Sequence, residues 1–283
     1  MASHLFQLIR AHQWYKNIVV FLAIFFSGNL LEGSELYRVF WALGAFCFIS
    51  SANYIINDLV DIAQDKLHPE KKFRPLAAGK VQKLPAFLLA CVLLIIGLLL
   101  AYVLGKPFFY AAFALFLLTQ IYSFFLKNIV FADILTIGVL FVLRAMAGAL
   151  AINVKISPWL ILCPFFLSLF LSVGKRHAEV HQLKDKAWYA RTVLREYDHD
   201  LTTSLMTIST TLLVISYALY SFLSEHPNLI YTLPLALFVI FRFYYLINSG
   251  SIIARQAEKM VVDIQMLIGV LLWTIVSAVI IYG

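Results

Sequence analysis

The sequence predicts an all-α membrane protein, a polytopic bundle of nine transmembrane helices with its N-terminus in the cytoplasm. Of its 283 residues, 62% are hydrophobic and only 13% are charged, with a mean hydropathy of +0.88. A soluble domain is nearer half apolar and a quarter charged, so too few polar side chains remain to cover a water-facing surface. Because no polar stretch is long enough to form a soluble domain, we expect one integral membrane domain over residues 1–283.

Nine apolar runs predict the membrane spans. A helix needs about 20 residues to cross the hydrocarbon core, and its backbone groups must bond within the segment because lipid offers them no partner. The first run is the weakest, since Ser27, Gly28 and Asn29 end it early. The predicted spans are residues 15–31, 36–56, 84–104, 107–126, 131–151, 157–174, 202–223, 229–247 and 261–282.

Basic residues gather on one side of these spans. The opposite side carries only Arg38, Lys106 and Lys155, whereas 17 of the 22 Lys and Arg residues lie on the first side. Cytoplasmic loops carry the excess of Lys and Arg, so we expect the first side to face the cytoplasm of a cell membrane and the C-terminus to lie outside. The cytoplasmic segments are the N-terminus and the loops 57–83, 127–130, 175–201 and 248–260.

The formal net charge of +7 does not indicate nucleic acid as a partner. The charges lie in short loops beside membrane spans, where they set orientation and attract anions to the bilayer surface. We therefore expect the lipid bilayer and anionic ligands as partners, and no nucleic acid. The sequence leaves the oligomeric state open, and a homo-oligomer is one alternative.

The most informative motif lies where the second span ends and reads N-D-x-x-D-x-x-x-D, with Asn57, Asp58, Asp61 and Asp65 as its polar members. On a helix, Asp61 and Asp65 share one face with Asn57 or with Asp58, and Tyr54 lies one turn earlier. Crowded carboxylates repel one another unless a cation lies between them. Because Mg²⁺ prefers oxygen ligands and usually bridges a few carboxylates to substrate phosphates, the four motif residues are predicted metal ligands with Mg²⁺ as the cofactor.

Basic residues follow this motif in a loop that Pro69, Pro75 and Gly79 shape. Lys72 and Arg74 lie in this loop, next to the predicted metal site. There they would clamp a diphosphate from the side opposite the aspartates. The alternative is a loop whose positive charge only fixes the topology.

The aspartate motif resembles the first motif of the UbiA-type intramembrane prenyltransferase superfamily, whose members hold an allylic diphosphate through Mg²⁺ and attach its prenyl chain to an acceptor. The nine-span pattern is similar to that superfamily as well. Further segments resemble its polyprenyl-phosphate (decaprenyl-phosphate) phosphoribosyltransferase branch, and the resemblance covers essentially the whole chain. These segments are 13–17, 68–75, 122–127, 144–148, 174–179 and 191–197.

One departure from ordinary members of the superfamily is informative. They usually carry a second aspartate-rich motif after the sixth span, where this chain has Lys175, Arg176, His177 and Glu179. Basic residues in place of carboxylates argue against a second magnesium cluster and predict an extra anion. The 5-phosphate of phosphoribosyl pyrophosphate fits that expectation, and the alternative for Lys175 and Arg176 is topology anchoring alone.

The resemblance implies an enzyme that transfers 5-phosphoribosyl from phosphoribosyl pyrophosphate to polyprenyl (decaprenyl) phosphate, with Mg²⁺, and releases pyrophosphate. It also suggests a lipid-linked pentose supply for cell-envelope glycan, arabinan included. The catalytic residues it implies are Asp58, Asp61 and Lys127. The substrate-binding residues it implies are Lys16, Tyr54, Lys72, Arg74, Tyr122, Lys127, Arg144, Lys175, Arg176 and Arg191.

Arg144 is the most deeply placed of these residues. It lies about 16 Å along a helix from Asp133, which puts it near the middle of the membrane. An arginine there costs at least about 2.5–3.5 kcal/mol, so we expect it to face a partner or a wet cavity. A substrate contact and a purely structural pair are the two alternatives.

Two other functions remain to be distinguished. A prenyltransferase acting on an aromatic or quinone precursor shares the fold and the first aspartate motif, but the missing second motif argues against it. A transporter is the alternative from another class, and transporters place their polar residues near mid-membrane. Here the acidic residues gather at one membrane face, which favours the enzyme.

Overall fold

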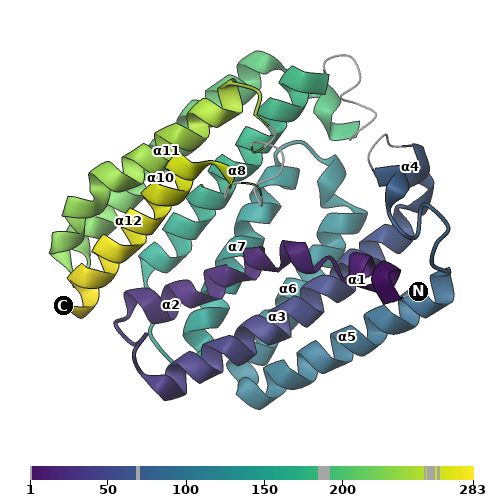
Figure 1. Cartoon of the computed structure of the whole chain (residues 1–283), viewed down its shortest axis with the longest axis horizontal. Coiled ribbons are helices and arrows are strands. Elements are labelled where there is room, and N and C mark those ends of the chain that lie inside the picture. Colours follow the sequence, from purple (N-terminus) through teal and green to yellow (C-terminus); the bar gives the residue numbers. More distant parts are fainter. Residues whose placement is uncertain (1, 68–70, 184–191, 252, 254–258, 260–261) are drawn as a thin grey trace. The chain divides into compact units, whose positions relative to one another are not determined.

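The structure is a computed structural model that describes residues 2–67, 71–183, 192–251, 253, 259 and 262–283. Within these residues the chain forms α-helices and 3₁₀-helices and no strand, so the all-α prediction is confirmed (Figure 1). Among the described residues, eight helical segments are long and apolar enough to cross a membrane. They are α3 (Gly33–Val60), α5 (Lys83–Leu104), α6 (Lys106–Phe124), α7 (Ala132–Ala151), α8 (Pro158–Leu183), α10 (His199–Leu223), η6 with α11 (Pro227–Thr232 and Leu233–Asn248) and α12 (Ile264–Tyr282).

The weakest predicted span, residues 15–31, does not form a long α-helix. It forms the 3₁₀-helix η1 (Ala11–Val20) and the short helix α2 (Phe21–Phe26). A 3₁₀-helix rises about 2.0 Å per residue, so the two together extend roughly 30 Å, which is comparable to the hydrocarbon core. The membrane bundle is thus confirmed by eight spans among the described residues, while the count of nine and the cytoplasmic N-terminus remain predictions.

The chain divides into two compact units. Unit 1 comprises residues 1–127 and 143–156, and unit 2 comprises residues 128–142 and 157–283. Helix α7 therefore contributes its first half to unit 2 and its second half to unit 1. The single domain expected over residues 1–283 is still a prediction.

Helix α3 is the main packing element of unit 1, and α5 lies along it (Figure 1). Gly97 permits the close approach, because a Cβ there would lie 2.7 Å from the side chain of Ile49. At the N-terminal end of α3, Arg38 donates from Nε to the Ala151 carbonyl at 2.6 Å and from Nη2 to the Leu104 carbonyl at 3.1 Å. It thereby satisfies carbonyls at the C-terminal ends of α7 and α5, which have no partners within their own helices.

The N-terminal segment also packs on α3. Helices α1 (Ala2–Ile9), η1 and α2 all contact it. A Cβ at Gly148 would collide with the carbonyl oxygen of Val20, so η1 and the second half of α7 approach more closely than any other residue there would allow. The N-terminal segment of unit 1 is therefore fixed along α3, with α2 beside its first half and η1 beside its second half.

Unit 2 is built on α8, α10, α11 and α12. Its core includes Phe170, Met206 and Phe243, and the two phenylalanine rings meet edge to face with centroids 5.5 Å apart. Two helices begin with aspartate caps. Asp198 accepts from Leu201 N at 2.7 Å and Asp263 accepts from Met266 N at 2.8 Å, which satisfies amide donors that the first helical turn leaves unpaired.

Candidate active site

The predicted aspartates lie where α3 gives way to α4 (Ile62–Leu67). Asp58 is in the last turn of α3, Asp61 is its C-terminal cap, and Asp65 lies in α4. The helical hydrogen bonds continue across the junction, from Asp61 N to the Asn57 carbonyl at 2.9 Å and from Asp65 N to the Asp61 carbonyl at 2.8 Å. All three side chains therefore stay close together at one end of unit 1.

Arg74 joins two of these aspartates. Its Nη1 donates to Asp58 Oδ1 at 3.0 Å and to Asp65 Oδ2 at 2.7 Å. Asp58 and Asp65 are seven residues apart, or two helical turns, so their carboxylates lie on one face. The 3₁₀ turn η2 (Lys71–Phe73) brings Arg74 to them. Arg74 therefore lies next to the aspartate motif and bonds to its carboxylates, while its predicted contact with a diphosphate stays a prediction.

Asp61 pairs with a different cation. Lys127, in the 3₁₀ turn η3 (Leu126–Asn128), donates from Nζ to both carboxylate oxygens of Asp61, at 2.7 and 2.8 Å. The single stripe predicted from the helical spacing is therefore divided in two. Asp58 and Asp65 share Arg74, and Asp61, at the point where α3 ends, faces Lys127.

Arg10 is a residue of this site that the sequence did not predict. Its Nη2 donates to Asp58 Oδ1, and its guanidinium lies 5.2 Å from the centre of the Tyr54 ring. The two paired residues are 48 positions apart in the chain, and no local spacing links them. The available signal was a lone cation just before a polar-aromatic segment that leads into the first apolar run.

We call this group of three carboxylates and three cations the aspartate site. Asp58 is 2% exposed and Asp65 4%, whereas the side chains of Arg10, Arg74 and Lys127 are between 17% and 24% exposed. Asp58 and Asp65 are thus sheltered behind cations that reach the surface of the site, whereas Asp61 is 15% exposed itself. Such an arrangement presents N–H donors to an incoming anion, and charge-assisted bonds to phosphate oxygens are among the strongest hydrogen bonds in proteins.

The same carboxylates are the candidate metal ligands. Within the residues that the structure describes, no three acidic, imidazole or thiol groups are placed to hold a metal ion together. Asp58 and Asp65 do converge on one cationic nitrogen, and a pair of carboxylate oxygens is the donor set that Mg²⁺ takes alongside substrate phosphates. The residues therefore fit a magnesium ion held partly by substrate, and the four-residue ligand set, Asn57 included, remains a prediction.

Three further predicted residues of unit 1 lie outside this ion-pair group. Lys16 lies in η1 with its Nζ 5.8 Å from the centre of the Tyr15 ring, and Lys72 is exposed with its Nζ 5.1 Å from the Phe73 ring. Tyr122 is half-buried near the end of α6. Their substrate contacts remain predictions.

Arg144 faces the polar interior of unit 1 rather than lipid. It is buried, and its Nε donates to Asn17 Oδ1 at 2.9 Å. The same oxygen accepts from Ser50 Oγ at 3.3 Å, and Asn17 is itself buried. The sequence argument that a mid-membrane arginine needs a polar environment therefore holds, with η1 supplying that environment.

Unit 2 holds a second ion-pair cluster, which we call the unit 2 cluster: Asp133, Arg176, Glu179 and Tyr197. Arg176 donates from Nε to Asp133 at 2.8 Å and from Nη1 to Glu179 at 2.8 Å. The Tyr197 hydroxyl donates to the other oxygen of Asp133 at 2.7 Å and accepts from Phe131 N at 3.1 Å. Burial and the bond to Asp133 raise the pKa of Tyr197 well above its usual value, so it stays a donor.

This cluster bears on the predicted role of Arg176. Its side chain is 2% exposed and Asp133 is fully buried, so both charges are satisfied inside unit 2. That geometry favours a structural role for Arg176 over contact with a substrate. Lys175, its neighbour on α8, is half-buried, and Arg191 lies outside the described residues.

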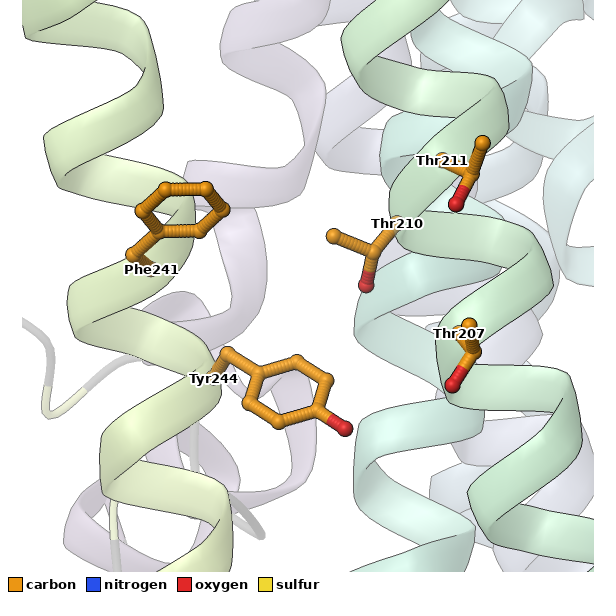
Figure 2. A pocket seen from close by; sticks show the side chains of 5 residues that line it. All are labelled: Thr207, Thr210, Thr211, Phe241 and Tyr244. Carbon is orange, nitrogen blue, oxygen red and sulfur yellow. The ribbon is translucent and has the colours of Figure 1, made fainter.

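A cavity of about 230 Å³ lies between α10 and α11 of unit 2, lined by the three threonines and two aromatic rings that Figure 2 shows. The hydroxyls of Thr207 and Thr210 donate to carbonyls of their own helix, at 3.2 and 2.7 Å. The cavity wall is therefore mostly methyl groups and ring surface and carries no charge. It suits hydrocarbon and does not suit a diphosphate.

Comparison with known proteins identifies the family of this chain. Residues 18–280 match the model of the UbiA prenyltransferase family. A decaprenyl-phosphate phosphoribosyltransferase of Mycolicibacterium smegmatis is 33% identical over 238 residues, covering 82% of this chain and 74% of the relative. One of the same name from Mycobacterium tuberculosis is 34% identical over 219 residues, covering 76% of this chain and 72% of the relative.

A solved structure shares the fold. The UbiA homolog from Archaeoglobus fulgidus bound to GPP and Mg²⁺ superposes with a TM-score of 0.75 at 20% identity, covering 99% of this chain and 97% of the other. At that identity the likeness supports the fold alone. The family match and the eight apolar helices among the described residues together identify an integral multi-pass membrane protein.

Proposed function

Because the chain belongs to the UbiA prenyltransferase family, we propose that it uses the aspartate site to transfer 5-phosphoribosyl from phosphoribosyl pyrophosphate to a polyprenyl phosphate. The products are polyprenyl-phosphoryl-5-phosphoribose and pyrophosphate. Relatives named decaprenyl-phosphate phosphoribosyltransferase, 33–34% identical over most of the chain, support this choice of substrates. The observation that carries it is the aspartate site, where partly exposed cations pair with less exposed carboxylates.

The cations of the aspartate site would hold the diphosphate directly. Arg10 and Arg74 both bond to Asp58, and Lys127 bonds to Asp61, so each cation is already oriented by a carboxylate. Preoriented donors stabilise charge that develops on a leaving group without reorganising during the reaction. Since the departing pyrophosphate carries more charge than the bound diphosphate ester, such contacts accelerate the reaction rather than merely tighten binding.

A divalent ion fits the same site. Asp58, Asp61 and Asp65, with Asn57, would hold Mg²⁺, which when bound neutralises part of the diphosphate charge. The solved homolog bound to GPP and Mg²⁺ supports this choice of metal.

The chemistry needs little from the protein beyond charge and placement. The bond from ribose C1 to the pyrophosphate oxygen breaks, and its electron pair leaves with pyrophosphate. A new bond joins C1 to an oxygen of polyprenyl phosphate, which is already ionised and so needs no strong general base. Lys127 and Arg74 stabilise the growing negative charge on the leaving pyrophosphate. Lys175 is the candidate to bind the remaining phosphate, either the 5-phosphate of the ribose or the phosphate of the lipid.

The proposal includes a location. The bias of Lys and Arg supports an aspartate site at the cytoplasmic face of the cell membrane, where phosphoribosyl pyrophosphate is soluble and the lipid phosphate is at the interface. The product would serve as a lipid-linked pentose precursor for cell-envelope glycan.

One assay tests the proposal. Purified protein supplied with phosphoribosyl pyrophosphate labelled in the ribose, polyprenyl phosphate and Mg²⁺ should give a labelled lipid that extracts into organic solvent. A parallel reaction with a prenyl diphosphate and an aromatic acid should give no product. Prenylation of the aromatic acid without any labelled phosphoribosyl lipid would replace the proposal with the alternative prenyltransferase. Uptake of label into proteoliposomes without turnover would indicate a transporter.

A further inference from the structure

We propose that Arg10 is a substrate-binding residue of the aspartate site, contributed by the N-terminal segment, which holds an oxygen of the leaving diphosphate. This inference rests on the proposed function and deepens it. It makes the N-terminal segment a third part of unit 1 that contributes a cation to the site. The other two are the basic loop with Arg74 and the turn with Lys127, which both come later in the chain.

The contacts of Arg10 leave its guanidinium able to take an anion. Within the described part of the chain it bonds to one oxygen of Asp58 and stacks near the Tyr54 ring. A guanidinium carries five N–H donors in a fixed fork, so one carboxylate oxygen engages a small part of that capacity. The side chain is 17% exposed, which gives an incoming phosphate access to it.

The charge around Asp58 points the same way. Its Oδ1 accepts from Arg10 Nη2 and also from Arg74 Nη1. Arg74 also bonds to Asp65, so two guanidinium groups face two carboxylates and their charges balance. Asp58 would keep its bond to Arg74 if Arg10 turned to a phosphate oxygen, so the exchange would leave no buried carboxylate unpaired.

The chain on both sides of Arg10 is tied to the same face of α3 as Asp58, through the Ile9 carbonyl and the Trp14 side chain. Ser51, Tyr54 and Asp58 lie at spacings of three and seven residues, which places them on one helical face. Ser51 is fully buried; its Oγ donates to the Ile9 carbonyl at 2.9 Å and accepts from Trp14 Nε1 at 3.0 Å. Arg10 is therefore held between two anchors that flank it.

The conformation of Arg10 is also unusual. Its backbone is left-handed, with φ 51° and ψ 48°, at the junction of α1 and η1. A residue with a Cβ rarely adopts this conformation, and where it persists the surrounding contacts hold it there. Here those contacts come from Ser51 and Trp14, and the resulting turn directs the arginine side chain onto Asp58.

Binding of magnesium pyrophosphate to the purified full-length protein, measured by titration calorimetry, tests the inference. Arg10→Gln should weaken that binding at least about tenfold, since it removes a charged hydrogen bond, and Arg10→Lys should recover part of the loss. The Michaelis constant for phosphoribosyl pyrophosphate should rise in parallel, while that for polyprenyl phosphate should not. Lys80→Gln, which removes the same charge from an exposed position of the basic loop, should leave the affinity unchanged.

Two results separate this inference from the proposed function. Unchanged pyrophosphate affinity in a folded Arg10→Gln protein overturns the role of Arg10, even if phosphoribosyl transfer proceeds normally. Weakened pyrophosphate affinity in Arg10→Gln, together with a wild-type protein that makes no phosphoribosyl lipid, supports the role of Arg10 and overturns the proposed reaction. Should Arg10→Gln fail to fold, Ser51→Ala provides the test, because it releases the backbone at Ile9 while the arginine charge remains. It should raise the same Michaelis constant, and an unchanged constant would count against the inference.

Discussion

The aspartate site of unit 1 and the unit 2 cluster contain the same kinds of residue and differ in the exposure of their cations. In the aspartate site, Arg10, Arg74 and Lys127 have side chains 17–24% exposed, whereas Arg176 of the unit 2 cluster is 2% exposed. Both groups place a buried aspartate next to an arginine. Access to the cation, more than residue type, therefore distinguishes the proposed anion-binding site from the cluster that joins α7 and α8.

The origin of each cation explains the difference. The three cations of the aspartate site come from a helix junction and from turns. Arg176 comes from the interior of α8, with one partner a helical turn away and the other in the first turn of α7. A cation on a turn can exchange a carboxylate for a phosphate with little rearrangement, whereas one locked between helices cannot.

The largest expected effect is the loss of transfer in Asp61→Asn. The amide keeps the shape of the side chain but removes the negative charge opposite Lys127, so phosphoribosyl transfer should fall by about 10²–10³-fold. The labelled-lipid assay measures it, with Asp200→Asn as a fully exposed control for the same chemical change. A folded Asp61→Asn protein with full activity would exclude Asp61 from the site.

Removal of the magnesium ion should have a comparable effect. Chelation with EDTA should stop transfer, and added Mg²⁺ should restore it, since the carboxylates of Asp58 and Asp65 otherwise face the diphosphate with like charge. Titration of Mg²⁺ into chelated protein, followed by the labelled-lipid assay, gives the measurement. Undiminished transfer in excess chelator would show that the carboxylates serve some other purpose.

Arg176→Met should act on stability rather than on substrate. It leaves Asp133 buried without its charge partner, which costs about 3–5 kcal/mol, so the melting temperature should fall clearly. The double variant with Asp133→Leu should recover part of that loss. The Michaelis constant for phosphoribosyl pyrophosphate should not change in the folded protein. A raised constant with an unaltered melting temperature would move Arg176 into the substrate site.

Tyr197→Phe should have a smaller effect on the same cluster. The hydroxyl bonds to an ionised, buried Asp133, and losing such a bond costs about 1.5–3 kcal/mol. The variant also predicts a change with pH. Because folding raises the pKa of Tyr197 above its ordinary value of 10.0, its stabilisation is complete below about pH 10 and is lost as pH rises further. Between pH 8 and about 11, the melting temperature should therefore fall more steeply with pH for the wild type than for Tyr197→Phe. The same slope for both proteins would contradict this assignment.

The smallest expected effect belongs to the partly exposed pair of Arg242 and Asp263. Exposed pairs contribute little, so Asp263→Asn should shift the melting temperature least of the series. The bond from Arg242 lowers the pKa of Asp263 below its ordinary value of 3.8. Its stabilisation is therefore present above about pH 4 and is lost on further acidification, and the variant should lack that acid-induced component. A large shift at neutral pH would show that exposure does not rank these ion pairs.

Much of the fold could be predicted from the sequence because hydrophobic length is a local property. The predicted span 36–56 corresponds to α3, and 84–104 to α5, with ends that differ by a few residues. The segment 15–31 was harder, because apolar length alone does not separate an α-helix from a 3₁₀-helix. Here Trp14 and Asn17 bond across to α3, and those tertiary contacts accompany the tighter winding.

Those residues of the candidate site that lie close together in the sequence could be predicted. The motif on α3 and the nearby Arg74 come from adjacent segments, and the family resemblance supplied Lys127. Arg10 could not be found this way, because its link to Asp58 spans 48 residues and depends on a left-handed turn. The separation of Asp61 from its two neighbours also needed the structure, since it follows from the exact residue at which α3 ends.

The most direct test of this comparison is an experimental structure of the protein with Mg²⁺ and phosphoribosyl pyrophosphate bound. We predict density for the diphosphate against Asp58 and Asp61, with Arg74 and Lys127 on its oxygens, and an unchanged contact between Arg176 and Asp133. Diphosphate density remote from all three aspartates, or bound to Arg176 after that buried contact has opened, would contradict the account.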